Sequence, residues 1–190
     1  LLKPYWRRAL IKFLLMFMVT KALLAGQRVL ITRPRQQSEQ LTQLIEQAGG
    51  GAIVFPVIAI KALALSDWLV PDLAQTNWLI FVSRNAVASF MAGWQHDLPE
   101  HLKFAAVGGG TAKAMRESGL TVHCQPQTSS GSDGLLTMPE MQAVAGCNIL
   151  IIRGVGGREL LADTLASRGA NISYLEVYRR ELPTHGDAAC

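Results

Sequence analysis

The fold is decided by a stretch of sequence that occurs twice, 120 residues apart. The first copy, residues 29–49, reads VLITRPRQQSEQLTQLIEQAG, and the second, residues 149–169, reads ILIIRGVGGRELLADTLASRG. Each copy begins with an apolar run typical of a buried strand and continues into a helical pattern that ends at glycine. The sequence therefore predicts one β-loop-α-β unit used twice, as if two similar domains each begin with it.

The alternative is that any two strand-helix units look alike. Duplication is favoured because Arg33 pairs with Arg153, and Glu39 with Glu159, at identical loop positions. If the second copy were followed by the elements that follow the first, those elements would lie beyond Cys190. We therefore expect the chain to be truncated at its C-terminal end.

Outside the copies, short apolar runs alternate with amphipathic helical patterns. Strands are expected at residues 28–32, 78–82, 104–107, 148–152 and 172–180, with a weaker candidate at 121–124. Helices are expected at residues 36–48, 84–94, 111–118, 132–141 and 158–167, with Pro139 weakening the fourth. A long extended run covers residues 52–65. This alternation predicts an α/β protein with a parallel sheet.

Composition excludes several classes of protein. Of the 190 residues, 49% are hydrophobic and 17% charged, which permits a real core and argues against a disordered chain. Cys124, Cys147 and Cys190 are far apart and outside any C-x-x-C motif, so neither a disulfide framework nor a zinc knuckle is expected. The cysteine pattern fits a reducing, cytoplasmic setting.

The net charge of +4 belongs to the N-terminal tail, since residues 1–17 hold four basic and no acidic residues. The rest is neutral, so a nucleic-acid binder is not indicated. The apolar run at residues 13–19 is too short to span a membrane. We expect residues 1–26 to be an N-terminal extension from translated upstream sequence, with a start near Met18. An interfacial helix and a signal peptide are the alternatives, and no stable membrane association is expected.

Three loops after predicted strands carry small polar residues at helix starts. They are Ser83-Arg84-Asn85, Gly108-Gly109-Gly110-Thr111 and Ser132-Asp133-Gly134. Such residues can simply cap a helix, but backbone N–H groups at a helix start also bind anions. Several such loops at one sheet edge would suit a ligand with several carboxylates or phosphates.

The second copy of the repeat imitates a dinucleotide fingerprint. Its loop, residues 154–159, reads GVGGRE, and Glu176 follows Gly156 by 20 residues. Glu159 occupies the third glycine position, which argues against the match. A non-catalytic anion- or dinucleotide-binding module remains the alternative function.

Other chemistry has weaker signals. The four histidines show no metal-ligand spacing, no G-x-S-x-G motif occurs, and Ser83 has no evident histidine partner. Tyr178 lies on an extended segment beside Arg179 and Arg180, where it could be a half-buried strand residue next to a solvated basic pair.

Taken together, these residues resemble the uroporphyrinogen-III synthase family across residues 27–183. The matching stretches are VLITRP (29–34), WLIFVSRNAV (78–87), AVGGGTA (106–112), SDGLL (132–136), RGVGGRELL (153–161) and VYRR (177–180). The resemblance implies two similar parallel-sheet α/β domains joined by a two-stranded ladder. The first domain, which is discontinuous, would be incomplete here.

The implied domain organisation follows the chain. Residues 27–50 would start domain 1, residues 51–65 and 170–183 would be the linker strands, and residues 66–169 would form the complete domain 2. Residues 184–190 would start the missing rest of domain 1. An inactive, poorly folded fragment is therefore a third possible reading.

The resemblance also implies a function. The family is a lyase that dehydrates and closes hydroxymethylbilane, a linear tetrapyrrole with eight carboxylates, to uroporphyrinogen III with inversion of ring D. It needs no metal or cofactor, and we expect a monomer acting on this small molecule. Tyr178 is expected to be the catalytic residue, as proton donor or as a group that orients the substrate. The expected substrate-binding residues are Ser83, Arg84, Asn85, Gly110, Thr111, Arg33, Arg153 and Gly154, although the two loop arginines Arg33 and Arg153 could equally brace their loops.

Overall fold

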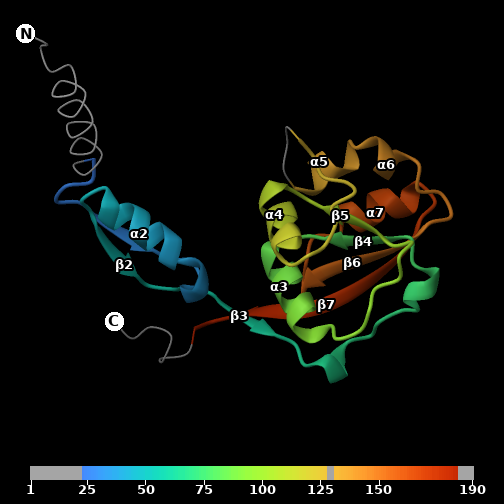
Figure 1. The fold of residues 1–190 in the computed structure, drawn as a ribbon, viewed down its shortest axis with the longest axis horizontal. Helices are drawn as coiled ribbons and strands as arrows, with labels where there is room; N and C mark the ends of the chain where they lie inside the picture. The colour runs from blue at the N-terminus through green and yellow to red at the C-terminus, as the bar shows by residue number, and fades with distance from the viewer. Residues whose placement is uncertain (1–22, 128–130, 184–190) are drawn as a thin grey trace, which may run out of the picture. The chain divides into compact units, whose positions relative to one another are not determined.

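The computed structural model describes residues 23–127 and 131–183 (Figure 1). The chain divides into two compact units, Leu1–Ala59 with Glu181–Cys190, and Ile60–Arg180. The predicted N-terminal extension through residue 22, and the predicted start of the rest of domain 1 at residues 184–190, lie outside the described residues.

The described part of the first unit contains a single β-α-β element. Strand β1 (Arg28–Ile31) leads through a 3-10 turn, η1 (Arg35–Gln37), into α2 (Glu39–Gln47), and β2 (Gly51–Val54) pairs with β1 in parallel. The helix predicted from residue 36 in fact begins at Glu39. The buried Ser38 separates the two pieces, because its hydroxyl donates a hydrogen bond of 3.1 Å to the carbonyl of Pro34.

The second unit is built on a five-stranded sheet of order β3-β7-β6-β4-β5. Its strands are β3 (Ala59–Ala62), β4 (Trp78–Phe81), β5 (Lys103–Ala106), β6 (Asn148–Gly154) and β7 (Asn171–Glu181). The last four run parallel, as the alternation of elements predicts. Two 3-10 turns, η2 (Leu65–Asp67) and η3 (Leu73–Gln75), connect β3 to β4.

Helices cover both faces of this sheet (Figure 1). One face packs against α3 (Arg84–Gly93) and α4 (Gly109–Glu117). The other packs against α5 (Ser132–Leu136), α6 (Pro139–Gln142) and α7 (Leu160–Ser167). The longest described helix, α3, has ten residues, and no described helix has the length and apolar character needed to cross a membrane.

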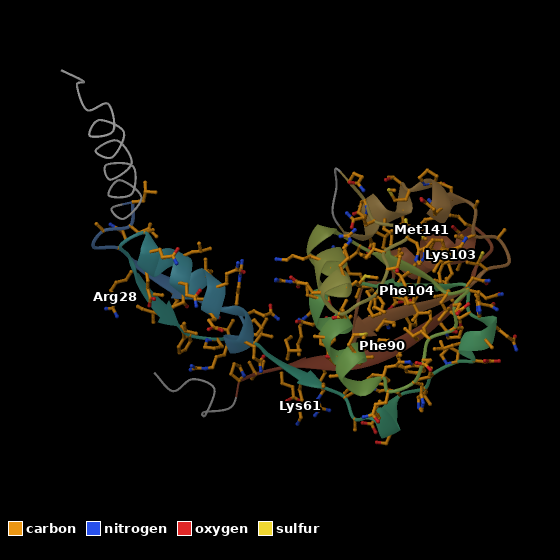
Figure 2. All side chains as sticks on the ribbon, in the orientation of Figure 1. Arg28, Lys61, Phe90, Lys103, Phe104 and Met141 are labelled. Atoms are coloured by element: carbon orange, nitrogen blue, oxygen red, sulfur yellow. The ribbon has the colours of Figure 1, made fainter. Side chains whose placement is uncertain are left out.

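Strand β4, an inner strand between β6 and β5, is apolar throughout because it contributes to two cores. Successive side chains of a strand point to opposite faces. Accordingly, Leu79 and Phe81 join Phe90 of α3 in one cluster, whereas Ile80 joins Met141 of α6 in the other. Figure 2 labels Phe90 and Met141, one in each core.

The repeated β-loop-α-β unit is confirmed at the level of strand register. Arg28 pairs with Gly51 in the first copy, and Asn148 pairs with Asn171 in the second, so both pairs of strands have the same register. Gly49 and Gly169, which follow the two helices, have φ angles of 82° and 87°. Only glycine adopts this left-handed conformation readily, which explains why both copies end at this residue.

Three local expectations are revised. The helix predicted at residues 132–141 is split into α5 and α6, because Pro139 occupies the first turn of α6, where its missing N–H costs nothing. The strand predicted at residues 121–124 is reduced to one bridge between Ala105 and Cys124. The extended run at 52–65 contains two separate strands, β2 and β3. The domain boundaries themselves stay predictions.

Candidate active site

A cavity of about 460 Å³ opens where β4, β6 and β7 approach their carboxyl ends. Ser83, directly after β4, lines it together with Arg153 and Gly154 at the end of β6 and Tyr178 of β7. Loops at the carboxyl ends of parallel strands gather at one edge of a sheet, which brings these distant residues together. Four of the predicted site residues therefore border one space.

A hydrogen bond joins Ser83 and Tyr178 in the wall of this cavity. The distance between Ser83 Oγ and Tyr178 Oη is 3.1 Å, and either hydroxyl can donate. Ser83 is also the N-cap of α3, and its Oγ accepts a hydrogen bond of 3.0 Å from the N–H of Ala86. The helix cap therefore fixes the serine, and the serine fixes the phenol. Tyr178 is only 2% exposed, so its ring has little freedom to reorient.

Gly154 packs directly against the ring of Tyr178. A Cβ atom at Gly154 would lie 2.5 Å from Cζ of Tyr178, closer than atoms can approach. The strand pairing explains the contact. Arg153 lies opposite Glu176 and Gly154 opposite Tyr178, so β7 carries one extra residue, Val177, at this point. The structure thus gives Gly154 a packing role beneath the tyrosine.

Arg153 is held by two carboxylates and an aromatic ring. Its Nη1 lies 2.7 Å from an oxygen of Glu159, and its Nη2 lies 3.2 Å from an oxygen of Glu176. The guanidinium carbon lies 3.7 Å from the centre of the Tyr174 ring, and the Tyr174 hydroxyl donates to the other oxygen of Glu159. This geometry favours the bracing role for Arg153 over direct substrate binding.

The same network shifts the pKa values of the Glu159 carboxyl and the Tyr174 phenol. The hydrogen bond from Tyr174 and, next, the hydrogen bond from Arg153 hold the pKa of the Glu159 carboxyl below its ordinary value of 4.5. Burial, followed by the hydrogen bond to Glu159, raises the pKa of Tyr174 to about 12. Glu159 is therefore ionised and Tyr174 neutral at neutral pH.

The lowered pKa of Glu159 leads to a prediction about the stability of the fold in acid. A carboxyl whose pKa is lowered in the folded state stabilises the fold above its unfolded pKa, and that contribution is lost as the pH falls below it. Glu159→Gln should therefore lower the melting temperature at neutral pH, and its difference from the unaltered chain should shrink below pH 4.5. Thermal melts between about pH 6 and about pH 3 measure this.

Glu117→Gln is the matched control, because Glu117 makes a single exposed ion pair of 3.6 Å with Lys113. Its melting temperature should follow the unaltered chain at every pH, as exposed pairs contribute little. Parallel curves for Glu159→Gln and the unaltered chain would contradict the role of Glu159.

A second cavity, of about 330 Å³, lies beside the first and shares Ser83 with it. Arg84, Gly110 and Thr111 line it, at the N-terminal ends of α3 and α4. A Cβ atom at Gly110 would lie 3.8 Å from Cδ of Arg84, so these two loops are in close contact. Three further predicted residues are therefore placed where backbone N–H groups can meet an anion.

Two predicted residues lie outside the two cavities. Asn85 lies in the first turn of α3 and lines neither of them. Arg33 belongs to the first unit, where it lies exposed in the loop after β1, and its carbonyl accepts a hydrogen bond of 3.4 Å from Ser38 Oγ.

Four other residues with polar side chains also line the first cavity: Tyr174, Arg158, Arg180 and Ser132. Ser132 was expected only as part of an anion-binding helix start, and Arg180 only as part of a solvated basic pair. Tyr174 and Arg158 were not predicted as site residues. A signal was present for Arg180, because it lies two residues after Tyr178, and alternate residues of a strand share a face. Ser132 lies on a helix of five residues and adds a hydroxyl to the wall.

Among residues 23–127 and 131–183, no group of three or more His, Cys, Asp or Glu side chains is placed to hold a metal ion. The polar groups in the described cavities are hydroxyls, arginines and backbone N–H groups. Such a set can bind a polyanion and can donate a proton from a phenol.

Comparison with known proteins gives a consistent picture. The family model for uroporphyrinogen-III synthase HemD matches residues 39–190. The uroporphyrinogen-III synthase of Proteus mirabilis is 36% identical over 162 residues, which cover 80% of this chain and 79% of that protein. The uroporphyrinogen-III synthase of Salmonella typhimurium is 38% identical over 160 residues, covering 80% of this chain and 64% of that protein.

Solved structures agree. A mutant uroporphyrinogen III synthase from the extremely thermophilic bacterium Thermus thermophilus matches with a TM-score of 0.62 and 26% identity, covering 84% of this chain and 64% of that one. The Helicobacter pylori protein, 18% identical with a TM-score of 0.51, shares the fold over 73% of this chain and 60% of its own. The chain thus spans slightly less than two thirds of the length of several relatives.

Proposed function

Because this chain belongs to the uroporphyrinogen-III synthase family, we propose that it cyclises hydroxymethylbilane to uroporphyrinogen III. The substrate is a linear tetrapyrrole with eight carboxylates and a terminal hydroxymethyl group. The observation that carries the proposal is the hydrogen bond between Ser83 and Tyr178, which orients a phenol in the wall of a cavity bordered by arginines.

The first proposed step is loss of the terminal hydroxyl. Tyr178 donates its phenolic proton to the leaving oxygen as the carbon–oxygen bond breaks, so the hydroxyl departs as water. With Ser83 Oγ already accepting from the N–H of Ala86, the serine proton is available to donate to Tyr178 Oη. This arrangement leaves the proton of the phenol free to point into the cavity.

The second proposed step is ring closure with inversion of the last pyrrole, through a spiro intermediate. The proton released at the carbon where the ring closes can restore the phenol. Closure in free solution proceeds without inversion, so the main task of the site is to hold a flexible chain in one geometry. The helix starts around the second cavity, with Ser83 and Thr111, support this by offering N–H groups and hydroxyls to carboxylates.

The dinucleotide-binding alternative is not favoured. In a dinucleotide site, the acid that follows the glycine loop binds the ribose. Here Glu176, the acid at that spacing, is ion-paired with Arg153, and Glu159 in the third glycine position is bound to the same arginine. Both carboxylates are therefore already paired with a side chain of the protein.

The proposal extends to the setting of the enzyme. We propose that it acts in the cytoplasm as a monomer, without a cofactor. The free thiols of Cys124 and Cys147 fit a reducing compartment. Light scattering coupled to gel filtration measures the oligomeric state.

The direct test is product analysis. The purified chain is given freshly made hydroxymethylbilane, the reaction is stopped early, and the oxidised products are separated into isomers I and III. Isomer III above the background without protein supports the proposal. Isomer I alone, from a chain that melts cooperatively, would count against this chain having the activity.

A further inference from the structure

The first cavity carries an unbalanced positive charge. The described residues that line it include three arginines, Arg153, Arg158 and Arg180, and no aspartate or glutamate. Two carboxylates lie nearby, those of Glu159 and Glu176, and both are ion-paired with Arg153. Of the three arginines in the cavity, Arg153 is thus neutralised by carboxylates of the protein.

Arg158 and Arg180 have no such partner. Both are exposed to solvent, and neither forms an ion pair within the part of the chain that the structure describes. An arginine always carries its charge, and its planar guanidinium matches a carboxylate with two parallel hydrogen bonds. Two such groups in one cavity, without a protein acid between them, form a site for a ligand with at least two carboxylates.

The two arginines come from different elements around the tyrosine. Arg158 lies in the loop between β6 and α7, and Arg180 lies on β7, two residues beyond Tyr178 and therefore on the same face of the strand. A ligand that is held by both has the phenol of Tyr178 in the same cavity. Binding to the two arginines would thus direct the ligand towards the Ser83–Tyr178 pair.

We propose that Arg158 and Arg180 are the carboxylate-binding residues of this cavity, and that Arg153 is a positioning residue that does not touch the ligand. The inference rests on the proposed function for the identity of the natural ligand, but its chemistry needs only a polycarboxylate. Arg153 supports the loop, because its guanidinium joins Glu159 after β6 to Glu176 on β7 and packs on the Tyr174 ring.

The test is a binding measurement with uroporphyrin I, a tetrapyrrole with eight carboxylates that the reaction does not consume. Fluorescence titrations compare the unaltered chain with Arg158→Gln and Arg180→Gln at low and at moderate salt. Each substitution should weaken binding roughly threefold to tenfold and flatten its salt dependence, as expected for partly exposed ion pairs. Arg116→Gln is the matched control, because Arg116 of α4 bonds to Gln125 and lines neither cavity.

Arg153→Gln separates the two roles. It should lower the melting temperature, because Glu159 and Glu176 lose their partner, and binding measured well below that temperature should weaken less than in Arg158→Gln. Unchanged affinity in both Arg158→Gln and Arg180→Gln would overturn the inference, as would an unaltered chain that does not bind uroporphyrin I at all. Arginine-dependent binding without formation of isomer III would instead sink the proposed function and leave the inference standing.

Discussion

Replacing Tyr178 with phenylalanine should lower the rate of isomer III formation by roughly a hundredfold or more, the usual contribution of a positioned general acid. The substitution removes the hydroxyl that is hydrogen-bonded to Ser83, while the ring still fills the space above Gly154. Because the ring remains, the protein should stay folded. Early-quenched assays that separate the two isomers measure the effect.

The other tyrosine of the cavity is the control. Tyr174→Phe removes a hydroxyl that is bound to Glu159 and not to Ser83, so it should affect stability more than the chemical step. The rate of isomer III formation in Ser83→Ala should lie between the rates of Tyr174→Phe and Tyr178→Phe, because Ser83→Ala leaves the phenol of Tyr178 in place without its hydrogen-bond partner. If Tyr178→Phe left both the rate and the isomer ratio as they were, the role of the phenol would be wrong.

Replacing Gly154 with alanine should destabilise the fold by about 2–3 kcal/mol, within the range for overpacked cores. The new Cβ atom would lie 2.5 Å from Cζ and 2.6 Å from Cε2 of Tyr178, a ring that is almost fully buried. The melting temperature should fall by roughly 5–10 °C. Isomer III formation should fall as well, because the displaced ring carries the hydroxyl away from Ser83.

Gly109→Ala provides the matched substitution. A Cβ atom there meets no heavy atom within 4 Å, and Gly109 begins helix α4, so alanine should be neutral or slightly stabilising. Tyr178→Ala in the Gly154→Ala background should cost much less than the sum of the single changes, since the clash disappears with the ring. Strict additivity, or a Gly154→Ala protein that melts normally, would refute the close contact.

The sequence was a good guide to whatever depends on local pattern. The parallel α/β class and the repeated unit could be predicted, because apolar periodicity and the glycines after each helix are short-range signals. The break before α2 could not, because it depends on one buried hydroxyl, that of Ser38, bonding back to Pro34. The extent of pairing between β5 and residues 121–124, which is one bridge at Cys124, is a contact between separate segments that no local pattern encodes.

In the candidate site, too, several residues could be predicted from local pattern, whereas the contacts between them could not. Ser83 and Tyr178 could each be singled out, but their hydrogen bond joins residues 95 positions apart and follows only from the strand order. The partners of Arg153 were missed for the same reason, since Tyr174 and Glu176 reach it from a neighbouring strand. Sequence could therefore suggest which side chains matter, but not which arginines remain free to bind a ligand.

The extra residue in β7 is a bulge that reverses the alternation of side chains between the two faces of the sheet. Val177 and Tyr178 are neighbours in sequence, yet both belong to the core beneath α3 and α4, whereas Tyr174 packs against the opposite core. In a regular strand, Tyr178 would share the face of Tyr174, because the two are an even number of residues apart. Its hydroxyl would then point away from Ser83, the cap of α3. One irregular step thus lets β7 brace Arg153 on one side of the sheet and place the hydroxyl of Tyr178 beside Ser83 on the other.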